Sequence, residues 1–218
     1  LLASSAASDV YKRQVNRLSV GIQTFSERGR IFYNRTYSKN EVIERLKKLK
    51  NFFKGEVCVD IIYNFPDQTI EEVIEDARIV KKLELGSASF YSLMVHEGSK
   101  LSKDIEAEKV IIEEDMKKDY LLYSHFVDEM LRENKYHILE LTKIAKNGGD
   151  TYQYIQVRNS GGDTFPIGVG AGGSVQGIGV FRMNKEMSFY SKQTEYHAKF
   201  AKLSGIMQFP IISKESIK

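Results

Sequence analysis

One acidic residue inside an apolar run is the feature of this sequence that points most directly to chemistry. Residues 57–69 read VCVDIIYNFPDQT, so Asp60 stands in the middle of a strand-like run that ends in a turn before a helix. An unpaired buried charge costs more free energy than a strand gains from one extra side chain, so Asp60 needs a partner. Because parallel sheets hold their ligands at the carboxyl ends of strands, we expect Asp60 to belong to a ligand site.

A second stretch is rich in glycine. Residues 165–179 read FPIGVGAGGSVQGIG and contain six of the sixteen glycines of the chain. Glycine lets the backbone approach a ligand or another segment of the chain closely, and successive amide groups can donate hydrogen bonds. The segment therefore indicates a place where the backbone itself lies against a ligand or another part of the protein.

Three strand-and-helix units must position these residues. From Val15 onward, short apolar strands over residues 17–25, 57–65 and 89–95 alternate with amphipathic helices, which is typical of a parallel sheet in an α/β fold. Ser38 with Glu41, and Thr69 with Glu72, have the spacing of capping boxes at the start of the two helices. We expect these helices to end near Gly55 and at Gly86.

The pattern changes after Lys100. A long helix is expected over residues 108–133, with Met116, Tyr120, Tyr123, Val127 and Met130 as a buried stripe. Strands are expected over residues 136–143 and 151–157, separated by a turn at Asn147-Gly-Gly, and a helix over residues 185–202.

Composition narrows the class of protein. The 218 residues are 42% hydrophobic and 28% charged, with a net charge of +3, which suits one large or two small globular domains. Lysines such as those in residues 47–50 stand beside glutamates on helical faces, so we expect no nucleic-acid partner. No run reaches the ~18 apolar residues of a membrane span. Cys58, the single cysteine, excludes an internal disulfide and is expected to fill space in the core.

The first fourteen residues do not read as an ordinary part of a folded protein. Residues 1–8 contain the small side chains of a signal-peptide cleavage site but no preceding basic region. Residues 9–14 back-translate to a sequence resembling the transposon end used in sequencing libraries. We expect residues 1–14 to be adaptor sequence and the gene to continue upstream of Val15; a native terminal tail is the alternative.

Four stretches occur together in the order and spacing of one family: NRLSVGIQTF at residues 16–25, DIIYNFPDQT at 60–69, YSL at 91–93 and GVGAGG at 168–173. The chain resembles the radical S-adenosylmethionine (SAM) enzymes related to oxygen-independent coproporphyrinogen III oxidase, over nearly all of residues 15–190. The resemblance implies a six-unit β/α barrel with a [4Fe-4S] cluster on a CxxxCxxC loop. Residues 15–100 would be its last three units and residues 101–218 a smaller appended α+β region, with the cluster ligands upstream.

The resemblance also implies which residues contact SAM. Gln23, Arg35, Asp60 and Ile62 match SAM-binding positions of the family, with Ile62 acting through its backbone. A guanidinium can pair in a forked geometry with the methionine carboxylate, and a carboxylate can accept from an ammonium or a ribose hydroxyl. An internal Arg35–Asp60 ion pair is the alternative for those two residues, and an ordinary strand-end amide is the alternative for Gln23.

Two further positions carry a weaker match. Met94 matches a backbone contact to SAM, and the segment 170–174, which ends at Ser174, matches one near a second SAM or the substrate. The sequence does not indicate catalytic residues. His96 or His137 could ligate heme iron, since imidazole is a usual axial ligand, although ordinary surface roles are the alternative; His125 is expected to be a plain helix position, as is His197.

Two stretches, residues 151–157 and the glycine segment, indicate which branch of the family the chain resembles. The chaperone and coproporphyrinogen branches carry a His-Asn…Tyr-Trp element before the glycine segment, whereas this chain has TYQYIQV at residues 151–157 and no tryptophan. The glycine segment looks most like the heme-utilisation branch, whose members open the heme macrocycle by adding a methyl group. We expect a cytoplasmic enzyme of that kind, with flavodoxin or ferredoxin as electron donor; a heme chaperone or a coproporphyrinogen III dehydrogenase is the alternative.

The first strand of the printed chain is expected to lack a neighbour on one side. If three barrel strands precede Val15, the strand over residues 17–25 has an exposed edge, which is a template for aggregation. We therefore expect the chain as printed to be insoluble, inactive and without a cluster.

Overall fold

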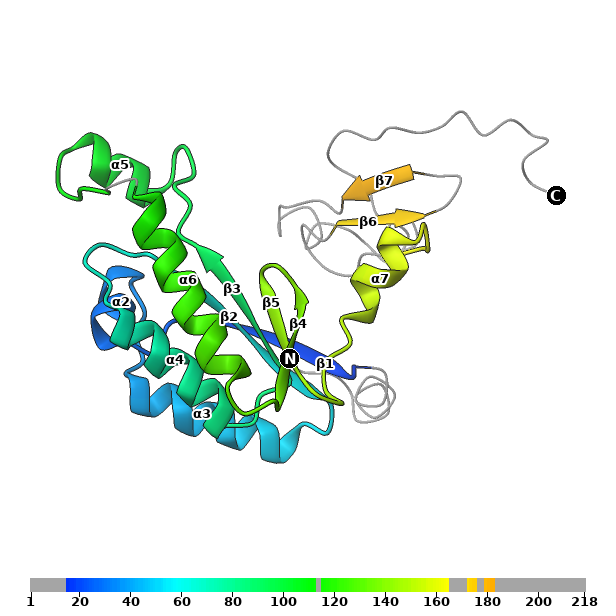
Figure 1. Ribbon diagram of the computed structural model, residues 1–218. Helices are drawn as coiled ribbons and strands as arrows, with labels where there is room; N and C mark the ends of the chain where they lie inside the picture. The colour runs from blue at the N-terminus through cyan, green and yellow to red at the C-terminus, as the bar shows by residue number, and fades with distance from the viewer. Residues whose placement is uncertain (1–14, 113–114, 165–171, 176–178, 183–218) are drawn as a thin grey trace. The chain divides into compact units, whose positions relative to one another are not determined.

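The computed structural model describes residues 15–112, 115–164, 172–175 and 179–182 (Figure 1). The chain divides into two compact units, Leu1–Thr151 and Tyr152–Lys218. Residues 1–14 and the expected helix at 185–202 lie outside the described residues. The expected domain boundary near residue 100 remains a prediction about the whole protein.

A five-stranded sheet forms the centre of the first unit. Its spatial order is β1-β2-β3-β5-β4, with β1 at Arg17–Gln23, β2 at Glu56–Tyr63, β3 at Ser87–Ser92, β4 at Tyr136–Glu140 and β5 at Lys143–Lys146. The pairs β1–β2 and β2–β3 are parallel, whereas β5 is antiparallel to both β3 and β4. The predicted α/β class with parallel strands is confirmed, and β1 lies at an edge of this sheet as expected.

Helices cover one face of the sheet (Figure 1). They are α3 at Lys39–Phe52, α4 at Ile70–Lys82 and α6 at Met116–Leu131. Two shorter helices, α2 at Glu27–Phe32 and α5 at Lys100–Glu106, lie in the connections that follow β1 and β3. Both predicted capping boxes form, at the first turns of α3 and α4. These caps satisfy backbone amides that the helix itself leaves without acceptors.

The alternation of β2 decides which side chains meet the helices. Val57, Val59 and Ile61 are buried in the core with residues of α3, α4 and α6. Successive side chains of a strand point to opposite faces, so Asp60 points to the face away from these helices. In register beside it, across neighbouring strands, stand Gly21 and Ser89.

The end of α4 differs from the prediction. The helix stops at Lys82, before the predicted end at Gly86, and Glu84, with φ of 48°, adopts the left-handed conformation. A Cβ atom at Gly86 would lie 2.2 Å from Oε2 of Glu56, so the Glu56 side chain would have to move to make room for it.

The long helix predicted over residues 108–133 starts later than expected, at Met116, and its buried stripe is confirmed only in part. Val127 and Met130 are buried and Tyr123 packs against the core. Asp115 caps α6 by accepting from the amides of Lys117 and Lys118. Met116 is 88% exposed and Tyr120 is 67% exposed. The residues of α6 that do pack into the core are Leu122, Phe126, Val127 and Met130.

The strand prediction after α6 was also partly wrong. The run 136–143 folds back on itself as the β4–β5 hairpin, because the chain turns between Glu140 and Lys143. The predicted turn at Asn147-Gly-Gly also forms, with the amide of Gly149 donating to the carbonyl of Lys146 at 2.9 Å, but no strand follows it directly. Residues predicted as a strand over 151–157 instead enter helix α7 at Gln153–Asn159. The second unit also contains the antiparallel strands β6, Gly172–Val175, and β7, Gly179–Arg182. Among described residues, no helix has the length and apolar character to cross a membrane.

Candidate functional site

The end of β1 is irregular at Gln23. The register with β2 shifts between Gly21 and Gln23, and Gln23 has a φ of 67°, which is a costly conformation for a residue with a side chain. Its Oε1 atom is buried and has no hydrogen-bond partner among the described residues. A buried oxygen without a donor costs ~1–3 kcal/mol. This combination of strain and an unsatisfied acceptor is what a ligand-binding side chain has before its ligand is bound.

Asp60 has a partner on the neighbouring strand. The hydroxyl of Ser19 lies 3.1 Å from each carboxylate oxygen of Asp60, which meets the predicted need for a partner in part. Asp60 is half-buried rather than fully buried. Among the described residues no ion pair joins it to Arg35, so the alternative of an internal Arg35–Asp60 pair is not realised there.

Arg35 lies in the loop between α2 and α3 and is exposed. It lines a cavity of about 380 Å³ together with Gly21 and Ile22 of β1. The buried Arg30 of α2 joins this loop to the end of β1, because its Nε donates to the carbonyl of Tyr37 and its Nη1 donates to the carbonyls of Ile22 at 3.2 Å and Thr24 at 2.9 Å. Burial lowers the pKa of Arg30. No local sequence pattern indicated that Arg30 would be buried.

The remaining predicted SAM contacts lie in different places. The carbonyl of Ile62 accepts a hydrogen bond of 3.2 Å from the hydroxyl of Tyr33, which occupies one of its two lone pairs. Met94 follows β3, is 64% exposed and lines a different cavity from that of Arg35. Ser174 belongs to β6 in the second unit, where its hydroxyl lies 3.2 Å from that of Thr164. Residues 165–171 of the glycine segment lie outside the described part.

Asp60, Ser89 and Lys143 stand side by side on β2, β3 and β5, a row of polar residues that the sequence did not reveal. Ser89, beside Asp60 in register, accepts from the ammonium of Lys143, which stands beside Ser89 on β5. Lys143 is 1% exposed, and burial lowers its pKa. Only the antiparallel pairing of β5 with β3 places this lysine near Asp60, and no sequence spacing indicates it.

A buried carboxylate, that of Asp150, lies near the amino-terminal ends of β1 and β3. Asp150 accepts from Nε of Arg17 at 2.9 Å, from the hydroxyl of Ser87 at 2.6 Å and from Sγ of Cys58 at 3.3 Å. Cys58 is buried, as predicted, and burial raises its pKa to about 11. A thiol with so high a pKa is a poor nucleophile at neutral pH, which agrees with a space-filling role.

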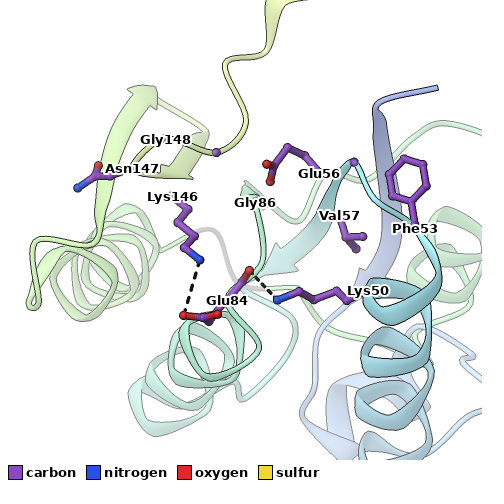
Figure 2. Close-up of a pocket in the computed structure, with 11 residues that line it drawn as sticks. Lys50, Phe53, Glu56, Val57, Glu84, Gly86, Lys146, Asn147 and Gly148 are labelled. Atoms are coloured by element: carbon purple, nitrogen blue, oxygen red, sulfur yellow. Dashed lines mark hydrogen bonds and ion pairs between the residues drawn. The ribbon is translucent and has the colours of Figure 1, made fainter. Parts of the chain in front are cut away.

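Figure 2 shows a cavity of about 290 Å³ at the amino ends of β2 and β3. Nζ of Lys50 lies 3.0 Å from the carbonyl of Glu84, and Nζ of Lys146 lies 3.7 Å from its carboxylate (Figure 2). Parallel sheets bind ligands at the opposite, carboxyl ends of their strands, so we interpret these contacts as joining helices to strands.

A third cavity, of about 1050 Å³, lies at the carboxyl ends of β2 and β3. The carboxylate of Asp119, on α6, accepts there from the hydroxyl of Tyr63 at 3.3 Å, from Nδ2 of Asn64 at 3.0 Å and from the hydroxyl of Ser92. Burial and the nearby Asp119 carboxylate raise the pKa of Tyr63. Asp119 therefore fixes the ends of both strands.

Several known proteins are similar to this chain in sequence. The defining pattern of the Radical SAM superfamily matches residues 6–80. The heme chaperone HemW of Lactococcus lactis is 27% identical over 165 residues, which cover 75% of this chain and 42% of that protein. The predicted resemblance to HemN-like radical SAM proteins is confirmed. Anaerobilin synthase of Escherichia coli O157:H7 is 24% identical over 164 residues, covering 74% of this chain and 36% of the synthase.

The fold agrees with these sequence matches. A solved structure of coproporphyrinogen III oxidase (HemN) from Escherichia coli superposes with a TM-score of 0.62 and 17% identity, covering 93% of this chain and 48% of the other. The chain thus spans less than half the length of each of these relatives.

A radical SAM domain generally implies SAM and a [4Fe-4S] cluster. The unsatisfied Gln23 oxygen and the Asp60 carboxylate suit SAM, whose ammonium and hydroxyl groups are donors. Within the part of the chain that the structure describes, no group of three or more His, Cys, Asp or Glu side chains could hold a metal ion. The described residues therefore fit SAM but offer no ligand set for the cluster.

Proposed function

We propose that this chain is part of a radical SAM enzyme that acts on a tetrapyrrole and that it contributes the Gln23, Arg35 and Asp60 side of the SAM site. The observation that carries the proposal is the buried Oε1 of Gln23 at the strained end of β1, which has no hydrogen-bond partner among the residues that the structure describes. When bound, SAM and a reduced cluster would supply radical chemistry to the site.

The chain's own residues bind and orient the cofactor in this proposal. Oε1 of Gln23 accepts a hydrogen bond from SAM, and Asp60, held by Ser19, accepts from its ammonium or a ribose hydroxyl. The exposed guanidinium of Arg35 pairs with the methionine carboxylate. The backbones of Ile62 and Met94 add contacts.

Ser174 and its glycine segment are proposed to lie near a second SAM or the substrate, in the position that the resemblance implies. The pairing of Ser174 with Thr164 orders the start of β6 and so supports a fixed backbone at this point.

The proposed reaction is anaerobic heme degradation by methyl transfer and ring opening, in the cytoplasm, with flavodoxin or ferredoxin as electron donor. The similarity to anaerobilin synthase supports it. Similarity to HemW favours a second candidate, a heme chaperone. A coproporphyrinogen III dehydrogenase is a third candidate of the same family.

The test uses the full-length protein with its upstream sequence and a reconstituted cluster. Anaerobic incubation with heme, SAM and a reductant should yield a methylated, linear tetrapyrrole, detected by mass spectrometry. Bound but chemically unchanged heme would favour the chaperone. An upstream sequence without CxxxCxxC would contradict the radical SAM proposal itself.

A further inference from the structure

The cavity at the carboxyl ends of β2 and β3 has an apolar lining that is open to solvent. Its volume of about 1050 Å³ is at the upper limit of the ~300–1,000 Å³ of small-molecule pockets. The large exposed side chains that line it are Met94, Val95, Met116, Tyr120 and Leu141. A cluster of exposed apolar side chains of this kind marks a surface that binds a partner or a ligand.

The cavity is formed in advance of any ligand. Asp119 holds the ends of β2 and β3 through three hydrogen bonds, and the hydroxyl of Tyr123 donates to the carbonyl of Leu141 at 2.7 Å. Rigid walls reduce the entropy that binding would otherwise cost.

The polar side chains of the lining differ in whether they are already occupied. Asp119 accepts from three donors, and Asp115 accepts from the amides of Lys117 and Lys118 at the start of α6. His96 lines the same cavity, is exposed and makes no side-chain hydrogen bond in the described part of the chain. Its imidazole is therefore available to a ligand.

The second histidine considered as an iron ligand has a different environment. Nδ1 of His137, on β4, lies 2.8 Å from Oδ1 of Asn147, whose Nδ2 donates to the carbonyl of Asn134 at 2.7 Å. His137 does not line this cavity. The structure thus separates two histidines that the sequence left equivalent.

We propose that the cavity binds an iron tetrapyrrole and that His96 is an axial ligand of its iron. A planar macrocycle would cover the apolar walls, while a neutral imidazole nitrogen donates its lone pair to the metal. The inference rests on the proposed function and sharpens it, because a porphyrinogen has no iron for His96 to bind.

The test is a spectroscopic titration of the full-length protein with hemin and, separately, with metal-free protoporphyrin IX. His96→Ala should shift the Soret band of bound hemin and weaken hemin binding about tenfold or more, while metal-free porphyrin binds as before. His137→Ala, the matched control, should leave both titrations unchanged. Leu141→Glu, at an exposed position, should weaken binding of both porphyrins because it charges the apolar wall.

The outcomes separate the inference from the function on which it rests. An unchanged Soret band and hemin affinity in His96→Ala would overturn the ligand assignment, and an unchanged Leu141→Glu would overturn the cavity. A wild-type protein that binds SAM but neither porphyrin would instead overturn the proposed tetrapyrrole function.

Discussion

The carboxylate of Asp76 lies buried in α4 beneath the end of β1, where it accepts a hydrogen bond of 2.8 Å from the hydroxyl of Thr24. It also accepts from the amide of Phe25 at 2.8 Å. Gln23 immediately precedes these residues, so Asp76 supports the strand end that carries the unpartnered oxygen.

Burial raises the pKa of Asp76 from 3.8 to about 7. The folded state then holds a proton that the unfolded state has lost, so the free energy of unfolding should fall as the pH rises from about 4 to about 7, and level off above that. Asp76→Asn should remove this dependence, as measured by urea unfolding across the pH range. Glu75→Gln, at an exposed position of the same helix, should retain it.

Gln23→Ala should weaken SAM binding about tenfold, because the hydrogen bond to the cofactor is lost. Its free energy of unfolding should not decrease, since the substitution removes an unsatisfied buried oxygen. Calorimetric titration with SAM and urea unfolding measure the two quantities. Gln153→Ala, at an exposed position, is the control for SAM affinity; wild-type affinity in Gln23→Ala would contradict the assigned role.

Asp119→Ala should lower the free energy of unfolding by ~1–3 kcal/mol, because Tyr63, Asn64 and Ser92 lose their common acceptor. The pKa of Tyr63 should fall as well, since the nearby carboxylate contributes to raising it. Urea unfolding and ultraviolet titration of tyrosine provide the measurements. Asp128→Ala, exposed on the same helix, should change neither.

Two ion pairs of equal length should differ in their contribution to stability. Lys81–Glu129 and Lys47–Glu44 both measure 2.8 Å, but the Glu129 side chain is 5% exposed and that of Glu44 is 60% exposed. Glu129→Ala should destabilise the protein by ~3 kcal/mol, because it leaves the ammonium of Lys81 without its main partner. Glu44→Ala should cost no more than ~0.5 kcal/mol. Equal losses in urea unfolding would contradict the burial argument.

Local sequence signals determined the early elements well. The Ser38 and Thr69 capping boxes form because each joins residues only three apart, and the alternation around Asp60 set which face of β2 is buried. Such patterns need no knowledge of distant segments. The family resemblance rested on the same contiguous stretches.

Sequence patterns gave wrong predictions where the structure of a segment depends on which distant segment packs against it. Met116 and Tyr120 carry large side chains like those of the buried residues of α6, but the face that packs is decided by contact with α4 and the sheet. Residues 151–157 alternate like a strand, yet the residues from Gln153 onward lie in α7, because strand formation requires a neighbour that pairs with it.

The residues of the candidate site also divide into those that the sequence indicated and those that only the tertiary structure brought together. The sequence by itself identified Gln23, Arg35 and Asp60 as candidates and showed that a buried acid needs a partner. Only the tertiary structure chose Ser19 as that partner, placed Lys143 in the same row and put His96, not His137, in an apolar cavity. These choices depend on strand register and helix packing, which join residues far apart in the chain and so leave no local pattern.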